Sequence, residues 1–221
     1  MTWTIPNILT VMRLLAAPGV AIMFLYFHRP WADWFALTLF VGAAITDWFD
    51  GYLARLWKQE SKFGTMLDPI ADKAMVVIAI MVLTGYNGMN AWLILPATVI
   101  LFREVFVSGL REFLGAKAGL LKVTKLAKWK TTLQMVAIAV LFLGTGLEYL
   151  NIVAIKGMTP EQYLEAVAAG TAQPIPACGR TDCASYANRV GLVLIWIAAI
   201  LTAMTGFEYF SKAMPHLRED K

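Results

Sequence analysis

Residues 47–72 read DWFDGYLARLWKQESKFGTMLDPIAD and lie between two strongly apolar stretches of the chain. The segment carries four aspartates, which are Asp47, Asp50, Asp68 and Asp72. Asp47 and Asp50 are three positions apart, so on a helix they lie about 60° apart on one face. Asp68 and Asp72 are four positions apart, which corresponds to about 40°. This spacing predicts two neighbouring helices that each present a pair of carboxylates to a shared cavity.

The composition around this segment is that of a membrane protein. Of the 221 residues, 59% are hydrophobic and only 15% are charged, and the mean hydropathy is +0.62. Soluble globular proteins have about 45–50% apolar and about 25% charged residues. A soluble fold of this length cannot bury so much apolar surface. The composition also excludes a disordered chain, a coiled coil and a disulfide scaffold, so we expect an integral membrane protein.

Apolar runs long enough to cross a bilayer occur six times. A spanning helix needs about 20 mostly apolar residues, and no long strand-like alternation is present. We therefore predict an all-α polytopic membrane protein in which residues 1–221 form a single integral membrane domain with six transmembrane helices. The predicted spans are residues 7–27, 31–54, 64–86, 91–114, 129–150 and 188–210.

The distribution of basic residues predicts the orientation. Of the 19 Lys and Arg, 15 fall on the side that holds both termini, and four fall on the other side. By the positive-inside rule, both termini and the aspartate segment lie in the cytoplasm, at the inner membrane. The net charge of +4 is then explained by topology and anionic lipid, and we expect no nucleic-acid partner.

The longest extramembrane segment is predicted at about residues 151–187, on the outer side. Thr159, followed by Pro160 and by Gln162 at the third helical position, has the chemistry of a helix start, and Gly170 is a suitable stop. Cys178 and Cys183 follow. A local disulfide that staples this loop is the favoured interpretation in an oxidising compartment, and redox sensing is the alternative.

Acidic side chains at membrane depth require an explanation. Each costs about 2.5–3.5 kcal/mol on insertion scales, and four together repel one another. Bound divalent cations offset both costs, and Mg²⁺ prefers oxygen ligands. Two carboxylate pairs on adjacent helices suit two metal ions that share ligands, as in sites of phosphoryl transfer. The alternative is a set of solvated charges at a helix–loop boundary.

Small residues and one cation accompany the aspartates. Gly51, Ala54 and Gly64 allow a bulky ligand to approach the backbone closely, although small residues also serve helix packing in membranes. Arg55 can balance phosphate charge. These residues are candidates for binding a phosphorylated donor.

The order Asp47-x-x-Asp50-Gly51-x-x-Ala54-Arg55, eight residues, Gly64-x-x-x-Asp68-x-x-x-Asp72 resembles the full signature of the CDP-alcohol phosphotransferase family. Similarity extends over nearly the whole chain and includes residues 5–13, 103–104, 110–112 and 128–134. The outer loop with its two cysteines departs from the family pattern. The resemblance implies a six-helix membrane enzyme, usually a homodimer, that transfers a phosphatidyl or similar group from a CDP-linked donor to an alcohol and releases CMP.

The resemblance also implies substrates and roles. The donor would be CDP-diacylglycerol and the acceptor sn-glycerol 3-phosphate, with two Mg²⁺ or Mn²⁺ ions. Asp47, Asp50 and Asp68 would be the principal metal ligands. Asp72 would be the general base, a further metal ligand, or both, and the sequence leaves these roles open.

An acceptor that carries a phosphate requires a cationic pocket. Arg103, Arg111 and Lys128 are the candidates, because eight positions on a helix bring Arg103 and Arg111 to within about 80° of each other. The alternative is an ordinary positive-inside cluster. Asn7 and Thr10 are candidates for lining the nucleotide pocket, or for capping the first helix.

Two other functions fit the same features. One is a related enzyme that uses another alcohol, such as serine or an inositol phosphate. The other, from a different class, is a divalent-cation transporter that uses the buried carboxylates. A transporter would not require Gly51, Ala54, Arg55 and Gly64 beside the acids, so the transferase is the favoured interpretation.

Overall fold

The computed structural model describes residues 5–28, 31–57, 62–88, 90–115, 125–155, 162, 165, 168–169 and 180–217. All regular structure within these ranges is helical, which confirms the all-α prediction. The helices are α1 (Ile5–Tyr26), α2 (Trp31–Trp57), α3 (Lys62–Tyr86), α4 (Ala91–Leu114), α5 (Lys125–Ile155) and α7 (Arg180–Leu217).

Each predicted span coincides with one helix, and the largest differences lie at the ends. α5 continues to Ile155 and α7 begins at Arg180, so both helices extend into the segment predicted as an outer loop. A helix satisfies its backbone hydrogen bonds internally and can continue beyond the apolar region. Hydropathy therefore locates the middle of these helices better than their ends.

Four helices are long and apolar enough to cross a membrane. Their spanning segments are Asn7–Tyr26, Ala91–Leu114, Trp129–Glu148 and Tyr186–Pro215. The protein is therefore a membrane-embedded helical protein. Among the described residues, α2 and α3 do not meet this criterion, and they are the two helices that carry the aspartate segment. Membrane crossing by these two helices remains a prediction.

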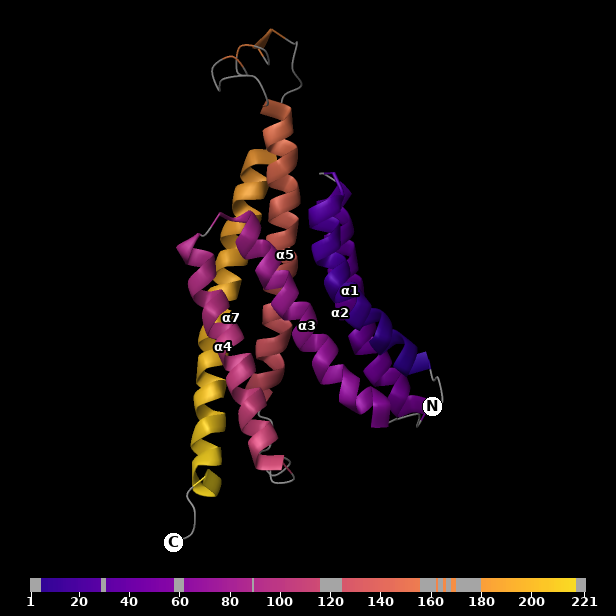
Figure 1. Cartoon of the computed structure of the whole chain (residues 1–221). Coiled ribbons are helices and arrows are strands. Elements are labelled where there is room, and N and C mark those ends of the chain that lie inside the picture. The colour runs from indigo at the N-terminus through magenta and orange to yellow at the C-terminus, as the bar shows by residue number, and fades with distance from the viewer. Residues whose placement is uncertain are drawn as a thin grey trace.

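Successive helices alternate in direction, which gathers the candidate residues at one end of the bundle (Figure 1). α1 lies beside α2, both α4 and α5 lie along α7, and α3 runs obliquely between the two groups. The start of α1 and the end of α7 lie at the same end. The end of α2, the start of α3, the end of α4 and the start of α5 lie there too.

Aromatic packing joins the first two helices to α5. The ring of Phe142 lies 5.7 Å from that of Phe24 and 5.7 Å from that of Phe40, measured between centroids. Phe40 and Phe142 are fully buried. Large aromatic side chains contribute much of the packing in such a core, so this cluster fixes α1 and α2 against α5.

Small residues allow α5 and α7 to pack closely. A Cβ added at Gly191 would lie 2.7 Å from Leu141 Cδ2, and a Cβ added at Gly144 would collide with the Asn188 side chain. Glycine at a contact lets membrane helices approach closely where lipid provides no hydrophobic drive. The contact is reciprocal, because each helix places a glycine against a side chain of the other.

Local capping sets the bounds of α4. The side chain of Asn90 accepts a hydrogen bond from the Trp92 N–H at 3.0 Å, as an N-cap does. The helix ends at Leu114, and Gly115 follows with a φ of 51°, which favours glycine. α4 therefore runs from Ala91 to Leu114 and carries Arg111 in its last turn.

Most of the predicted outer loop lies outside the described residues. Within the short helix predicted after Thr159, Gln162, Glu165 and Ala168 are helical, and the Ala169 N–H donates to the Glu165 carbonyl at 2.8 Å. Cys178 and the side chain of Cys183 are outside the described residues, so the predicted disulfide stays a prediction.

Candidate active site

The first helix holds the aspartates of the next two. The hydroxyl of Thr10 donates to Asp68 Oδ1 at 2.8 Å. Nη1 of Arg13 donates to Asp72 Oδ1 at 2.6 Å and also contacts Asp47 Oδ1. Carboxylates from α2 and α3 thus meet around two side chains of α1, as the predicted shared cavity requires.

Burial within this cluster is unequal. The Arg13 side chain is only 2% exposed, whereas those of Asp47 and Asp72 are 45% and 49% exposed. A buried guanidinium requires compensating charge, which the two carboxylates supply. Arg13 therefore contacts the two carboxylates from within the protein, and about half of each aspartate side chain remains exposed.

The remaining residues of the signature are placed only in part. Asp50, Gly51, Ala54 and Arg55 lie on the helical backbone of α2, but their side chains are outside the described residues. Gly64 is buried in α3. These positions are consistent with the predicted donor site but do not test it.

The two polar candidates on α1 lie within the helix. Asn7 and Thr10 are 5% and 2% exposed and follow the helix start at Ile5. Neither is therefore a cap of α1 within its described length, and capping is removed as the alternative interpretation. Both are buried, and Thr10 contacts Asp68.

A divalent cation needs several oxygen donors close together. No three His, Cys, Asp or Glu side chains among the described residues are close enough together to hold a metal ion. The donors that are present, from Asp47, Asp68 and Asp72, are all carboxylate oxygens, which is the chemistry that Mg²⁺ prefers. About half of the Asp47 and Asp72 side-chain surface is exposed. The donor atoms of these residues are therefore of the type that such an ion binds.

A cavity of about 260 Å³ lies next to this cluster and shares Asp72 with it. α3, α4, α5 and α7 all contribute to its walls. It is lined by Pro69, Asp72, Lys73, Val76, Arg103, Glu104, Val107, Arg111, Lys130, Thr131, Gln134 and Tyr209. The cavity therefore brings the predicted base together with two of the three predicted phosphate-binding residues.

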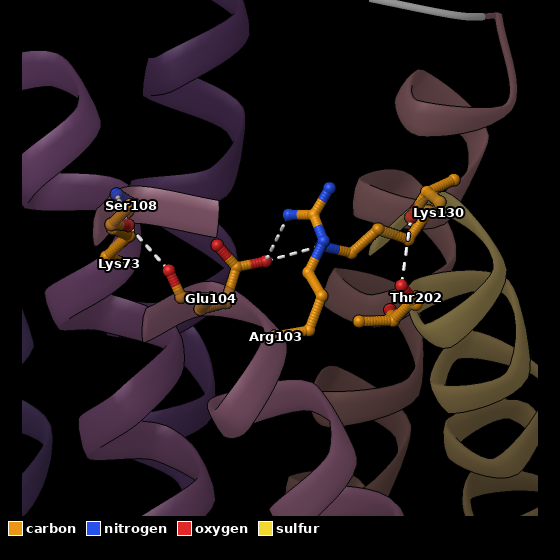
Figure 2. Close-up of polar contacts among 7 residues, drawn as sticks. Lys73, Arg103, Glu104, Ser108, Lys130 and Thr202 are labelled. Atoms are coloured by element: carbon orange, nitrogen blue, oxygen red, sulfur yellow. Dashed lines mark hydrogen bonds and ion pairs between the residues drawn. The ribbon is translucent and has the colours of Figure 1, made fainter. Parts of the chain in front are cut away.

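Glu104 organises the cations of this cavity. Its carboxylate accepts a hydrogen bond from Arg103 Nη1 at 3.2 Å and another from Lys130 Nζ. Figure 2 shows both cations reaching the same oxygen of this carboxylate, Oε1. Lys73 of α3 contacts the hydroxyl of Ser108 on α4, which in turn donates to the Glu104 carbonyl. These contacts tie α3, α4 and α5 together.

The third candidate cation, Lys128, has its side chain outside the described residues, so its role stays a prediction. Lys130, two positions further along α5, is 3% exposed and lines the cavity. The sequence showed basic residues at the start of a span without marking Lys130 as a cavity residue.

Arg111 differs from Arg103 in exposure. The Arg103 side chain is 13% exposed, whereas Arg111 is exposed at the mouth of the cavity. The Arg111 guanidinium carbon lies 5.7 Å from the centroid of the Tyr209 ring on α7. This distance permits a cation–π interaction, so Tyr209 holds Arg111 against the cavity wall.

Two buried polar atoms of the cavity lining lack partners. Gln134 Oε1 and Arg103 Nε have no hydrogen-bond partner among the described residues. Gln134 lies one turn after Lys130 on α5, so both side chains lie on the same helix face. No role for Gln134 was predictable from the sequence, because a glutamine in a spanning helix has no pattern that distinguishes ligand binding from packing.

A helical membrane protein that brings a signature of aspartates against a cationic cavity has the construction expected of a membrane-embedded phosphotransferase. The family model described as CDP-alcohol phosphatidyltransferase matches residues 3–207. The chain belongs to this family.

Full-length relatives share the similarity. The chain is 76% identical over 221 residues to a protein of Cereibacter sphaeroides, with 100% of both chains covered. It is 38% identical over 206 residues to a protein of Rickettsia bellii, with 93% of each covered. It is 33% identical over 221 residues to a protein of Pectobacterium atrosepticum, with 99% of this chain and 100% of the relative covered. Each relative is named CDP-diacylglycerol–glycerol-3-phosphate 3-phosphatidyltransferase.

Proposed function

We propose that this protein transfers the phosphatidyl group of CDP-diacylglycerol to sn-glycerol 3-phosphate, which gives phosphatidylglycerophosphate and CMP. The observation that carries the proposal is the cavity that places Arg103, Arg111 and Lys130 beside Asp72. The names of the full-length relatives support the same reaction.

The charge of the cavity suits this acceptor. Its ionisable lining residues are four cations (Lys73, Arg103, Arg111 and Lys130) and two carboxylates (Asp72 and Glu104). Fully ionised, they carry a net charge of +2, which balances a phosphate monoester dianion. Serine and unphosphorylated inositol would leave this charge unbalanced. Charge balance therefore favours a phosphorylated alcohol.

The reaction needs a base where the aspartate cluster meets the cavity, and Asp72 belongs to both. The C1 oxygen of glycerol 3-phosphate attacks the β-phosphorus of the donor while its proton passes to the Asp72 carboxylate. The bond from the β-phosphorus to the bridging oxygen breaks, and CMP leaves with that oxygen and its electron pair. The Arg13 contact holds Asp72 in position.

The donor carries a diphosphate that needs positive charge. Two Mg²⁺ or Mn²⁺ ions held by Asp47, Asp50 and Asp68, with Asp72 nearby, would neutralise the diphosphate when bound. Arg55 would add a charge-assisted hydrogen bond to phosphate. The other donor-side residues would be Gly51, Ala54, Gly64, Asn7 and Thr10. Thr10 keeps Asp68 in place through its hydroxyl.

We further propose that the protein lies in the inner membrane as a homodimer, with both termini and the active site in the cytoplasm. The start of α1, the end of α2, the start of α3 and the end of α7 lie at the same end of the bundle in Figure 1, which agrees with one cytoplasmic face. Single cysteines near Thr171 and Gly119, in a chain without Cys178 and Cys183, test the orientation. Only the first should react with an impermeant reagent added from outside, and the opposite result would reverse the topology.

The decisive experiment measures release of CMP from CDP-diacylglycerol by the purified protein in detergent. Glycerol 3-phosphate, serine, inositol and inositol phosphate are supplied in turn. We expect release with glycerol 3-phosphate and none above background with the other alcohols. Release with inositol phosphate alone would replace the acceptor, and no release with any alcohol would reject the transferase.

A further inference from the structure

Gln134 is a buried polar residue that the proposed chemistry does not yet use. Its side chain is 3% exposed and lines the cavity between Asp72 and the cations. Its Oε1 atom has no hydrogen-bond partner within the described part of the chain. A buried carbonyl without a donor carries a desolvation cost. The position is therefore expected to serve a group that arrives with the ligand.

The chemistry of an unpartnered carbonyl restricts what that group can be. A carbonyl oxygen only accepts hydrogen bonds, and a phosphate dianion has no hydrogen to donate. Lys130 and Arg103 each direct one donor at Glu104, and no hydrogen bond from either to Gln134 Oε1 is present among the described residues. A ligand hydroxyl is a donor that this carbonyl can accept from.

Glycerol 3-phosphate supplies such a hydroxyl at the appropriate position. In the proposed reaction its C1 hydroxyl faces Asp72 and its phosphate, on C3, faces the arginines. The C2 hydroxyl lies between these groups, on the middle carbon. Gln134 likewise lines the same cavity as Asp72 and Arg111.

We propose that Gln134 is a specificity-determining residue that accepts a hydrogen bond from the C2 hydroxyl of the acceptor. This inference rests on the proposed function. It assigns the cavity a preference for alcohols with a hydroxyl on the carbon between the attacking oxygen and the phosphate-bearing carbon. An acceptor without that hydroxyl leaves the carbonyl unpaired.

The test compares glycerol 3-phosphate with 3-hydroxypropyl phosphate, which lacks only the C2 hydroxyl. CMP release gives kcat/KM for each acceptor. The wild-type protein should prefer glycerol 3-phosphate by about 3- to 10-fold, the value of one neutral hydrogen bond. In Gln134→Met, which keeps the length but removes the acceptor, the preference should fall to within 2-fold.

Two further variants make the result specific. Gln134→Glu keeps an oxygen acceptor at the same place, so it should retain the preference even where its kcat falls. Thr202→Val is the matched control. Thr202 is also buried with an unpartnered hydroxyl oxygen, but it does not line the cavity. Its preference should equal that of the wild type.

The outcomes separate this inference from the proposed function. If the wild type uses glycerol 3-phosphate but shows no preference, or if Gln134→Met retains the preference, the role of Gln134 is rejected while the transferase stands. If the wild type releases no CMP with glycerol 3-phosphate, the proposed function is rejected and the role of Gln134 with it. Loss of the preference in both Gln134→Met and Gln134→Glu would indicate a packing role and also reject the inference.

Discussion

The two charged regions of this protein are built as opposites. Near α1, a single buried cation, Arg13, holds two carboxylates that are about half exposed. Near α4, a single carboxylate, Glu104, holds two cations that are largely buried, and its own side chain is 17% exposed. Each region uses one counter-ion to fix two like charges that would otherwise repel each other.

The difference between them lies in which charge faces outward. The acidic region presents carboxylates that remain accessible, as a site for incoming cations requires. The cationic region keeps Lys130 and Arg103 inside a cavity, where low dielectric strengthens their attraction for an anion. Among the four cations that line the cavity, Arg111 is the exposed one. Asp72 belongs to both regions, so the two substrates of a transfer reaction would meet at this residue.

The largest effect should come from removing a charge of the acidic region. Asp47→Asn should lower kcat by about 100- to 1000-fold, because loss of a ligand charge weakens several kcal/mol of stabilisation of the donor phosphates. The readout is CMP release after membrane insertion is verified. EDTA should produce a similar loss in the wild type. The matched control is Glu148→Gln, an exposed carboxylate toward the other end of α5. Activity within threefold of wild type in Asp47→Asn would count against the metal site.

A smaller effect should follow from replacing Arg111, the exposed cation of the cationic region. Arg111→Ala should raise the KM for glycerol 3-phosphate by about 10- to 150-fold, the value of a charge-assisted hydrogen bond. The KM for CDP-diacylglycerol should change little. Arg111→Lys should recover part of the loss, because a point charge does not reproduce the planar fork of arginine. A rise confined to the donor KM would move Arg111 to the nucleotide side.

Replacing Arg13, the counter-ion of the acidic region, tests whether it and the metal ion act on the same carboxylates. Arg13→Gln leaves Asp47 and Asp72 to repel each other, so without metal the free energy of unfolding should fall by about 1–3 kcal/mol. Mg²⁺ should then restore the lost stability and raise the melting temperature more than it does in the wild type. Thermal melts in detergent with EDTA or saturating Mg²⁺ measure both effects. An equal Mg²⁺-dependent rise in both proteins would show that Arg13 and the ion do not act on the same carboxylates.

The smallest effect concerns the support of Arg111. Tyr209→Leu removes the ring under the guanidinium and should raise the KM for glycerol 3-phosphate by about 2- to 5-fold, the value of an exposed cation–π contact. Tyr209→Phe keeps the ring and should remain within 2-fold of wild type. An equal rise in both variants would assign the effect to the Tyr209 hydroxyl instead of the ring.

Features that depend on nearby residues were predictable from the sequence. The six helices follow from apolar windows, and the faces of α2 and α3 follow from the spacing of their aspartates. The eight-residue interval between Arg103 and Arg111 placed both on one side of α4, and both line the cavity. The ends of α5 and α7 were less predictable, because polar residues continue these helices beyond the apolar region.

Features that depend on pairing between helices were not predictable. Arg13 is visible in the sequence as a charge in an apolar run, but its partners stand 34 and 59 positions away. The same holds for Lys130, whose partner Glu104 is 26 positions away. A single sequence contains the charges and their helix faces. It does not state which faces meet, and that arrangement decides which charges become partners.

The reciprocal glycine contact between α5 and α7 helps to set the orientation of the two helices relative to each other. Gly144 and Lys130 are 14 positions apart on α5, which is about 21 Å along a helix. A methyl group at Gly144 would collide with Asn188 Oδ1 and would lie 3.3 Å from the Asn188 backbone nitrogen, so either that side chain or the helix pair would have to shift. Over this length, a tilt of about three degrees shifts Lys130 by about 1 Å. The alignment of charges at one end of the bundle therefore depends on Gly144 and Gly191, which lack side chains and lie far along the helices from any substrate.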